Sequence, residues 1–212
     1  QVDIDSIAGP SDLLVLADES ANPAVVAAAL LSQAEHDEDA YALLVTVGAA
    51  PAARVQADVT RQLAALPEKD SRGKARRAVA EESIRRHGVV LVVESVDRLV
   101  ELANTLAAEH VSIQTNDARA IADRITRAGA LFVGHMTPEA AGDYLAGPSH
   151  VLPTGGAARY GAPLGVYDFV SRSSLIAYER SALAAQAKAI TTFARAEGLE
   201  AHARAVEVRL ED

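Results

Sequence analysis

The chain alternates short apolar runs with longer segments in which apolar residues recur at helical spacing. Short apolar runs are typical of strands, and the longer periodic segments are typical of amphipathic helices. Strand and helix alternate along the chain, which predicts an α/β fold with a mostly parallel, Rossmann-like sheet and flanking helices. The predicted strands are 13–16, 43–47, 89–93, 111–114 and 130–133.

Helices are predicted between these strands and in a tail after the last one. Asn22-Pro23 favours a helix start, because proline is tolerated in the first helical turn. The unbroken apolar run 89–93 predicts a strand that is buried on both faces. The predicted helices are 22–36, 51–66, 74–87, 96–107, 118–128, 174–197 and 200–208.

Glycine and proline accumulate between residues 147 and 166, where they exclude long regular elements. We therefore expect three parts along the chain. Residues 1–146 would form an α/β catalytic portion, 147–173 a Gly/Pro-rich active-site loop, and 174–212 a helical tail divided at Gly198. Ordered loops of such length are commonly functional.

Composition narrows the class of protein. Of the 212 residues, 50% are hydrophobic and 4% aromatic, so we expect a core built mainly from Ala, Val, Leu and Ile. The absence of cysteine excludes disulfides and leaves only nitrogen and oxygen ligands for a metal. The net charge of −9 argues against a nucleic-acid surface and is explained by solubility or by a salt-adapted source.

Two observations bear on location. No apolar run approaches the roughly 20 residues of a membrane span. The first five residues, QVDID, contain no basic region of the kind that opens a signal peptide. We expect a soluble, cytoplasmic protein that binds neither membrane nor nucleic acid.

Several polar side chains could carry chemistry. Gln33 and His36 are three residues apart, so on a helix they would share a face and could converge on one ion. A helix-end polar patch explains the same pair, and a solvated helix histidine explains His202. Glu109-His110 lies where a helix meets a strand, a position that suits proton transfer but also an ordinary polar turn.

Other candidates flank the start of the Gly/Pro-rich loop. They are Asp143 within GDY and His150 within GPSH. His87 and His135 belong to no cluster in the sequence, and we expect both to be solvated.

A series of ordered segments resembles one known family over essentially the whole chain. The most diagnostic is LLSQAEH at 30–36, and AEH at 108–110 resembles the family's Pro-Glu-His with Ala108 in place of proline. The family is histidinol dehydrogenase, the zinc-dependent enzyme that oxidises L-histidinol to L-histidine with NAD. The other matching segments are IAGPS at 7–11, AGALFVG at 128–134, TPEA at 137–140, GDY at 142–144, HVLPTGG at 150–156 and EGLEAH at 197–202.

The resemblance implies a role for each matching residue. Glu109 and His110 match the catalytic acid/base pair, and His150 matches a further active-site histidine. Ser11 and Glu197 match residues that hold the substrate together with His110, His150 and the metal ligands. The matching zinc ligands are Gln33, His36, Asp143 and His202.

It also implies a mechanism and an assembly. His110 would remove the alcohol proton in a first oxidation to the aldehyde, and Glu109 would activate the water that adds before the second. Related enzymes are homodimers, and the tail with Glu197 and His202 would complete either its own site or a partner's. Family members are about twice this length, and the resemblance assigns the NAD-binding domain to the part that precedes Gln1. No G-x-G-x-x-G occurs here.

Two rival functions remain open. The chain could hold zinc without catalysing a reaction, as a fragment or a separate subunit that needs a partner carrying the NAD-binding domain. It could also be a zinc hydrolase in which Glu109 activates a metal-bound water, although no H-E-x-x-H is present to favour that chemistry.

Overall fold

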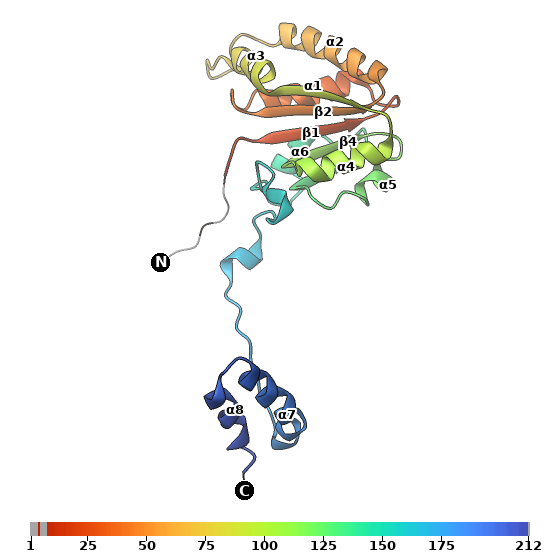
Figure 1. The fold of residues 1–212 in the computed structure, drawn as a ribbon. Helices are drawn as coiled ribbons and strands as arrows, with labels where there is room; N and C mark the ends of the chain where they lie inside the picture. Colours follow the sequence, from red (N-terminus) through yellow and green to blue (C-terminus); the bar gives the residue numbers. More distant parts are fainter. Residues whose placement is uncertain (1–3, 5–7, 212) are drawn as a thin grey trace. The chain divides into compact units, whose positions relative to one another are not determined.

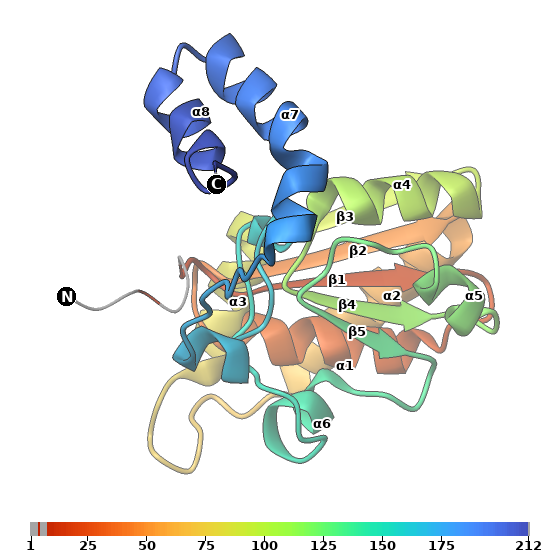
Figure 2. The same ribbon diagram turned by 90° about the horizontal axis from the view of Figure 1, so that it is seen from below.

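The computed structural model describes Ile4 and residues 8–211. Five strands form one parallel sheet in the order β3-β2-β1-β4-β5 (Figures 1 and 2). This is the predicted α/β class with a mostly parallel sheet. The strands are β1 (Asp12–Ala17), β2 (Tyr41–Val47), β3 (Gly88–Val93), β4 (His110–Gln114) and β5 (Ala130–Val133).

Helices cover both faces of the sheet. α1 and α3 contact β2 from one side, whereas α4 packs on β1, β2 and β3 from the other (Figures 1 and 2). The helices of the sheet unit are α1 (Pro23–Ala34), α2 (Ala49–Ala65), α3 (Arg76–His87), α4 (Val96–Leu106), α5 (Ala118–Ala122) and α6 (Glu139–Tyr144).

The alternation of side chains along β1 explains the two cores. Leu14 and Leu16 pack in one hydrophobic cluster with α4 and α5 residues such as Leu99. Leu13 and Val15 pack on the opposite face, in a second cluster with α1 and α2 residues. Because successive strand residues point to opposite faces, a strand between two helical layers must be apolar on both faces, as β1 is after its first residue, Asp12.

The expectation that the run 89–93 is buried on both faces is wrong for the described residues. β3 is an edge strand that pairs only with β2, and Val92 is 51% exposed. Its apolar sequence resembles that of a central strand, but position in the sheet decides exposure.

Three helix predictions also need correction. α1 ends at Ala34, because Glu35 caps it and Arg76 bonds to the carbonyl oxygens of Glu35 and His36. α5 ends at Ala122 rather than at residue 128. Beyond its end, the Asn104 side chain forms hydrogen bonds with the main chain of Arg124 and Thr126.

The tail helix α7 (Arg180–Ala196) begins six residues later than the predicted start at residue 174. α6 was not predicted at all, since its six residues are too short to show a period. Within the Gly/Pro-rich stretch only two 3-10 turns form, Ala157–Arg159 and Val166–Phe169.

The chain forms two compact units, residues 1–169 and 170–212. The second unit is a pair of helices, α7 and α8 (Glu200–Glu207), joined at Gly198, whose φ of +74° suits glycine. None of the helices in the described part of the chain combines the length and apolar character needed to cross a bilayer.

Candidate functional site

The amino ends of the two central strands bring three polar residues together. β1 begins at Asp12 and β4 begins at His110, and the register pairs Leu13 with His110, so Asp12 lies beside Glu109. α4 ends at Leu106, and the next residue, Ala107, adopts a left-handed φ of +52° that turns the chain toward β4. The sequence thus places Glu109-His110 at a helix-to-strand connection, as predicted.

Glu109 is buried and fixed by hydrogen bonds. Its Oε2 accepts from the Ser11 hydroxyl at 2.7 Å and from the Asp12 main-chain N–H at 3.2 Å. The Gln33 amide Nε2 donates in turn to Ser11 Oγ at 2.9 Å. Gln33, Ser11 and Glu109, which the family resemblance assigned to one site, therefore form one hydrogen-bonded chain.

The imidazole of His110 is held from one side. Its Nδ1 lies 3.2 Å from the Asp12 carbonyl oxygen and 3.6 Å from Glu109 Oε2. A carbonyl oxygen only accepts, so Nδ1 carries the proton in this hydrogen bond, and Nε2 is the ring nitrogen that the bond leaves free. The ring also stacks on Phe132, with centroids 5.8 Å apart.

Asp12 is a residue that the sequence analysis missed. The residue is 7% exposed, and its carboxylate accepts from the main-chain N–H of Glu109 at 2.6 Å and of Gly155 at 3.1 Å. Burial raises the pKa of Asp12, and the two main-chain donors and the nearby His110 act in the opposite direction. An acidic residue directly before the apolar run LLVLA was the available signal, because a carboxylate there is costly unless it is paired.

A cavity of 340 Å³ opens beside this cluster. Three residues predicted for the site line it: His110 from β4, Asp143 from α6 and His150 from the Gly/Pro-rich loop. Phe132 and Leu152 add apolar surface. The volume lies at the lower end of the range for small-molecule sites.

Gly142 lets α6 pack closely against β5 at the edge of the cavity. A Cβ atom at Gly142 would stand 2.8 Å from the Phe132 ring, so only glycine allows α6 to approach β5 at this point. Asp143, the next residue, is thereby brought to the cavity that His110 also lines.

The structure places the other predicted ligands as follows. Gln33 is buried near the end of α1, but His36 is exposed in the turn after it, so the expectation that the two share a helical face is wrong. Glu197 and His202 are exposed on the second unit. Within Ile4 and residues 8–211, no group of three or more His, Asp or Glu side chains is arranged to hold a metal ion.

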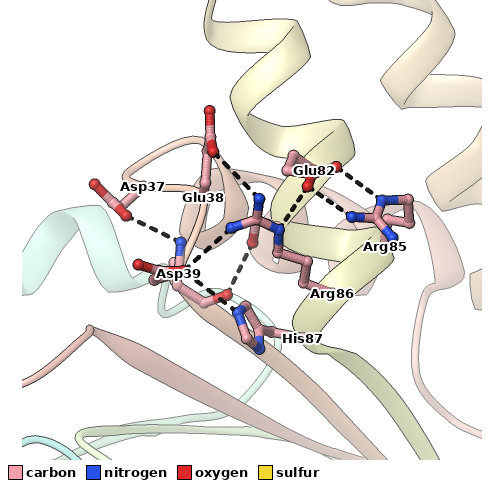
Figure 3. Close-up of polar contacts among 9 residues, drawn as sticks. Asp37, Glu38, Asp39, Glu82, Arg85, Arg86 and His87 are labelled. Carbon is pink, nitrogen blue, oxygen red and sulfur yellow. Dashed lines mark hydrogen bonds and ion pairs between the residues drawn. The ribbon is translucent and has the colours of Figure 1, made fainter.

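Two histidines expected to be solvated are partly enclosed. The side chain of His87 is only 23% exposed, and its ring lies against that of Tyr41, with centroids 4.5 Å apart and planes tilted by 36°. Its Nε2 lies 3.6 Å from Asp39 Oδ1 (Figure 3). His135 Nε2 is inaccessible to solvent and has no hydrogen-bond partner in the described structure. Both corrections come from tertiary packing that the linear sequence does not show.

Comparison with known proteins identifies the family. A family model described as histidinol dehydrogenase matches residues 1–210. The chain belongs to the histidinol dehydrogenase family. Histidinol dehydrogenases from Halalkalibacterium halodurans and Bacillus subtilis are each 50% identical, over 100% and 98% of this chain.

A solved histidinol dehydrogenase structure supports the fold. The protein from Elizabethkingia anophelis is 34% identical and superimposes with a TM-score of 0.88 over 97% of this chain. The chain covers 46% of that structure and 48% and 47% of the two bacterial relatives, so it spans about half the length of the histidinol dehydrogenases it matches.

Proposed function

We propose that this chain carries the acid/base residues and zinc ligands of a histidinol dehydrogenase that oxidises L-histidinol to L-histidine by way of L-histidinal. The observation that carries the proposal is the hydrogen-bonded chain of Gln33, Ser11 and Glu109, with His110 Nδ1 3.6 Å from Glu109 Oε2. The cavity beside it is lined by His110, Asp143 and His150. Membership of the family supports the same reaction and makes the protein an oxidoreductase.

His110 is the base of the first oxidation. Its Nδ1 is committed to the Asp12 carbonyl, so Nε2 is the nitrogen free to accept the hydroxyl proton when the carbinol carbon is oxidised. The imidazolium that results lies close to the Glu109 carboxylate and is stabilised by it.

Glu109 serves the second oxidation. Its Oε2 is occupied by Ser11 and Asp12, and no described contact engages Oε1. A carboxylate held in this way can take a proton from the water that adds to the aldehyde carbon. Proton transfer by a positioned group contributes roughly 10²–10⁴-fold to a rate.

The predicted ligands supply donor atoms that suit a zinc ion. Gln33 donates through Nε2 to Ser11, which fixes the amide and leaves its carbonyl oxygen as a ligand. With His36, Asp143 and His202 it makes a nitrogen and oxygen set that zinc accepts. When bound, zinc supplies a template that orients histidinol.

The described residues do not fit NAD. The turn after β1, where a Rossmann fold holds the pyrophosphate, contains Asp18 and Glu19 and no glycine. These carboxylates would repel phosphate groups. We propose that NAD binds to a part of the full-length protein that these 212 residues do not include. The 212 residues alone would then not turn over substrate.

The tail raises a question of assembly. We propose a homodimer in which α8 of one protomer supplies His202 to the site of its partner, because closed twofold pairing is the commonest route for exchanging such a segment. Mixing equal amounts of two full-length proteins, one with His36→Ala and one with His202→Ala, would then restore about a quarter of full activity, since half of the dimers regain one intact site. No recovery would show that each tail serves its own chain.

The reaction itself is tested by stoichiometry. A full-length histidinol dehydrogenase containing this chain should form two NADH and one histidine per histidinol. The zinc-hydrolase alternative predicts no NADH and cleavage of acylated histidinol. The 212-residue chain assayed alone should form no NADH. Turnover by it would refute the proposal that NAD binds outside these residues.

A further inference from the structure

Asp12 contacts both members of the proposed acid/base pair. Its carboxylate Oδ1 accepts from the Glu109 N–H, its own N–H donates to Glu109 Oε2, and its carbonyl oxygen faces His110 Nδ1. Asp12 is not among the residues that the family resemblance assigned to the site.

The second carboxylate oxygen reaches another part of the chain. Oδ2 accepts from the N–H of Gly155, in the loop that also carries His150. The same loop is tied to the segment before β1 by the bond from Gly9 N–H to Thr154 Oγ1 at 2.7 Å. One side chain thus connects the start of β1, the start of β4 and the Gly/Pro-rich loop.

Both oxygens are used, which makes the carboxylate hard to replace. An asparagine of the same shape offers one acceptor oxygen and one NH₂ group, so one of the two N–H donors would face another donor. A buried N–H without an acceptor is unfavourable, and the main chain would move to relieve it.

We propose that Asp12 is a positioning residue that sets the place of Glu109 and His110 and holds the Gly/Pro-rich loop against them. The inference rests on the proposed function for its consequence in catalysis. Since a displacement of about 1 Å can cost roughly 10²-fold in rate, small main-chain shifts at Asp12 should be visible in kcat.

The structural part is tested by amide hydrogen exchange in a full-length histidinol dehydrogenase that contains the chain. In Asp12→Asn the N–H of Glu109 or of Gly155 loses its acceptor, and that amide should exchange at least about tenfold faster. Asp117→Asn is the matched control, because Asp117 is exposed and its side chain makes no capping hydrogen bond. Unchanged protection at both amides in Asp12→Asn would overturn the proposal.

The catalytic part is tested with histidinal as substrate. Asp12→Asn should lower kcat by roughly 10²-fold, with KM changed by less than about threefold. In a protein that already carries Glu109→Gln, adding Asp12→Asn should lower kcat by less than about threefold, because Asp12 acts through Glu109 in this step. If Asp12 were purely structural, Asp12→Asn would lower kcat by the same factor in the parent and in Glu109→Gln. That additive result would overturn the proposal.

The two proposals fail differently. A parent protein with no activity on histidinol or histidinal contradicts the proposed function. The exchange experiment still decides whether Asp12 holds Glu109 and the loop. An active parent in which Asp12→Asn keeps full kcat contradicts the positioning role and leaves the proposed function intact.

Discussion

Two clusters in the sheet unit combine carboxylates with a histidine, and they differ in almost every other respect. Asp12, Glu109 and His110 are each no more than 7% exposed and are linked through main-chain groups. The second cluster joins Asp39 and Glu82 to Arg86 and His87 on the surface around α3 and the start of β2 (Figure 3).

The contrast shows which arrangement fixes titratable side chains well enough for proton transfer. In the surface cluster long side chains meet in water, where ion pairs are screened and their geometry is loosely held. In the buried cluster every carboxylate oxygen that makes a described contact meets a main-chain N–H or the Ser11 hydroxyl, so strand register fixes the side chains. Titratable groups held in that way are suited to proton transfer.

The largest difference should appear in activity. We expect His110→Ala to lower kcat/KM for histidinol by roughly 10²–10⁴-fold, because the base of the first oxidation is lost. His87→Ala removes the histidine of the other cluster and should leave kcat/KM within about twofold. Steady-state kinetics on a full-length protein containing the chain measures both, and equal losses would remove the distinction between the clusters.

The strands beneath the clusters should differ in stability. Leu14 in β1 is fully buried, and Leu14→Ala should lower the free energy of unfolding by about 2–5 kcal/mol. Leu91 in β3 is 37% exposed, and Leu91→Ala should cost no more than about half as much. Urea unfolding of the 212-residue chain measures the loss of unfolding free energy in Leu14→Ala and in Leu91→Ala. Equal costs would mean that β3 is as enclosed as β1.

The smallest difference concerns pH. Burial raises the pKa of Asp12 above 3.8, so the folded state holds that proton more tightly than the unfolded state. This contribution to stability is present below pH 3.8 and is lost as the pH rises through the folded-state pKa.

Glu82 behaves in the opposite way. Arg85 and Arg86 lower its pKa from 4.5 to about 2, so its contribution is present above pH 4.5 and is lost as the pH falls toward 2. The stability difference between the parent and Asp12→Asn should therefore fall as the pH rises, whereas the difference between the parent and Glu82→Gln should rise. Denaturant titrations from pH 2 to 7 measure both slopes, and slopes of the same sign would contradict the assignment.

Periodicity was enough to predict the parallel sheet, because each strand is a short apolar run between helical segments. It could not predict that β3 is an edge, since its sequence GVVLVV is as apolar as that of β1. The position of Glu109-His110 was also predictable from the chain. Asp12 was not, because its importance depends on register with β4 and on Gly155, 143 residues away.

The central claim is that Glu109 and His110 serve different oxidation steps at one site. Its most direct test is the rate of NADH formation by Glu109→Gln in a full-length protein containing this chain, started once from histidinol and once from histidinal. We predict that oxidation of histidinal falls by roughly 10²-fold or more, whereas the first turnover of histidinol changes by less than about tenfold. Equal losses from both substrates would contradict the account.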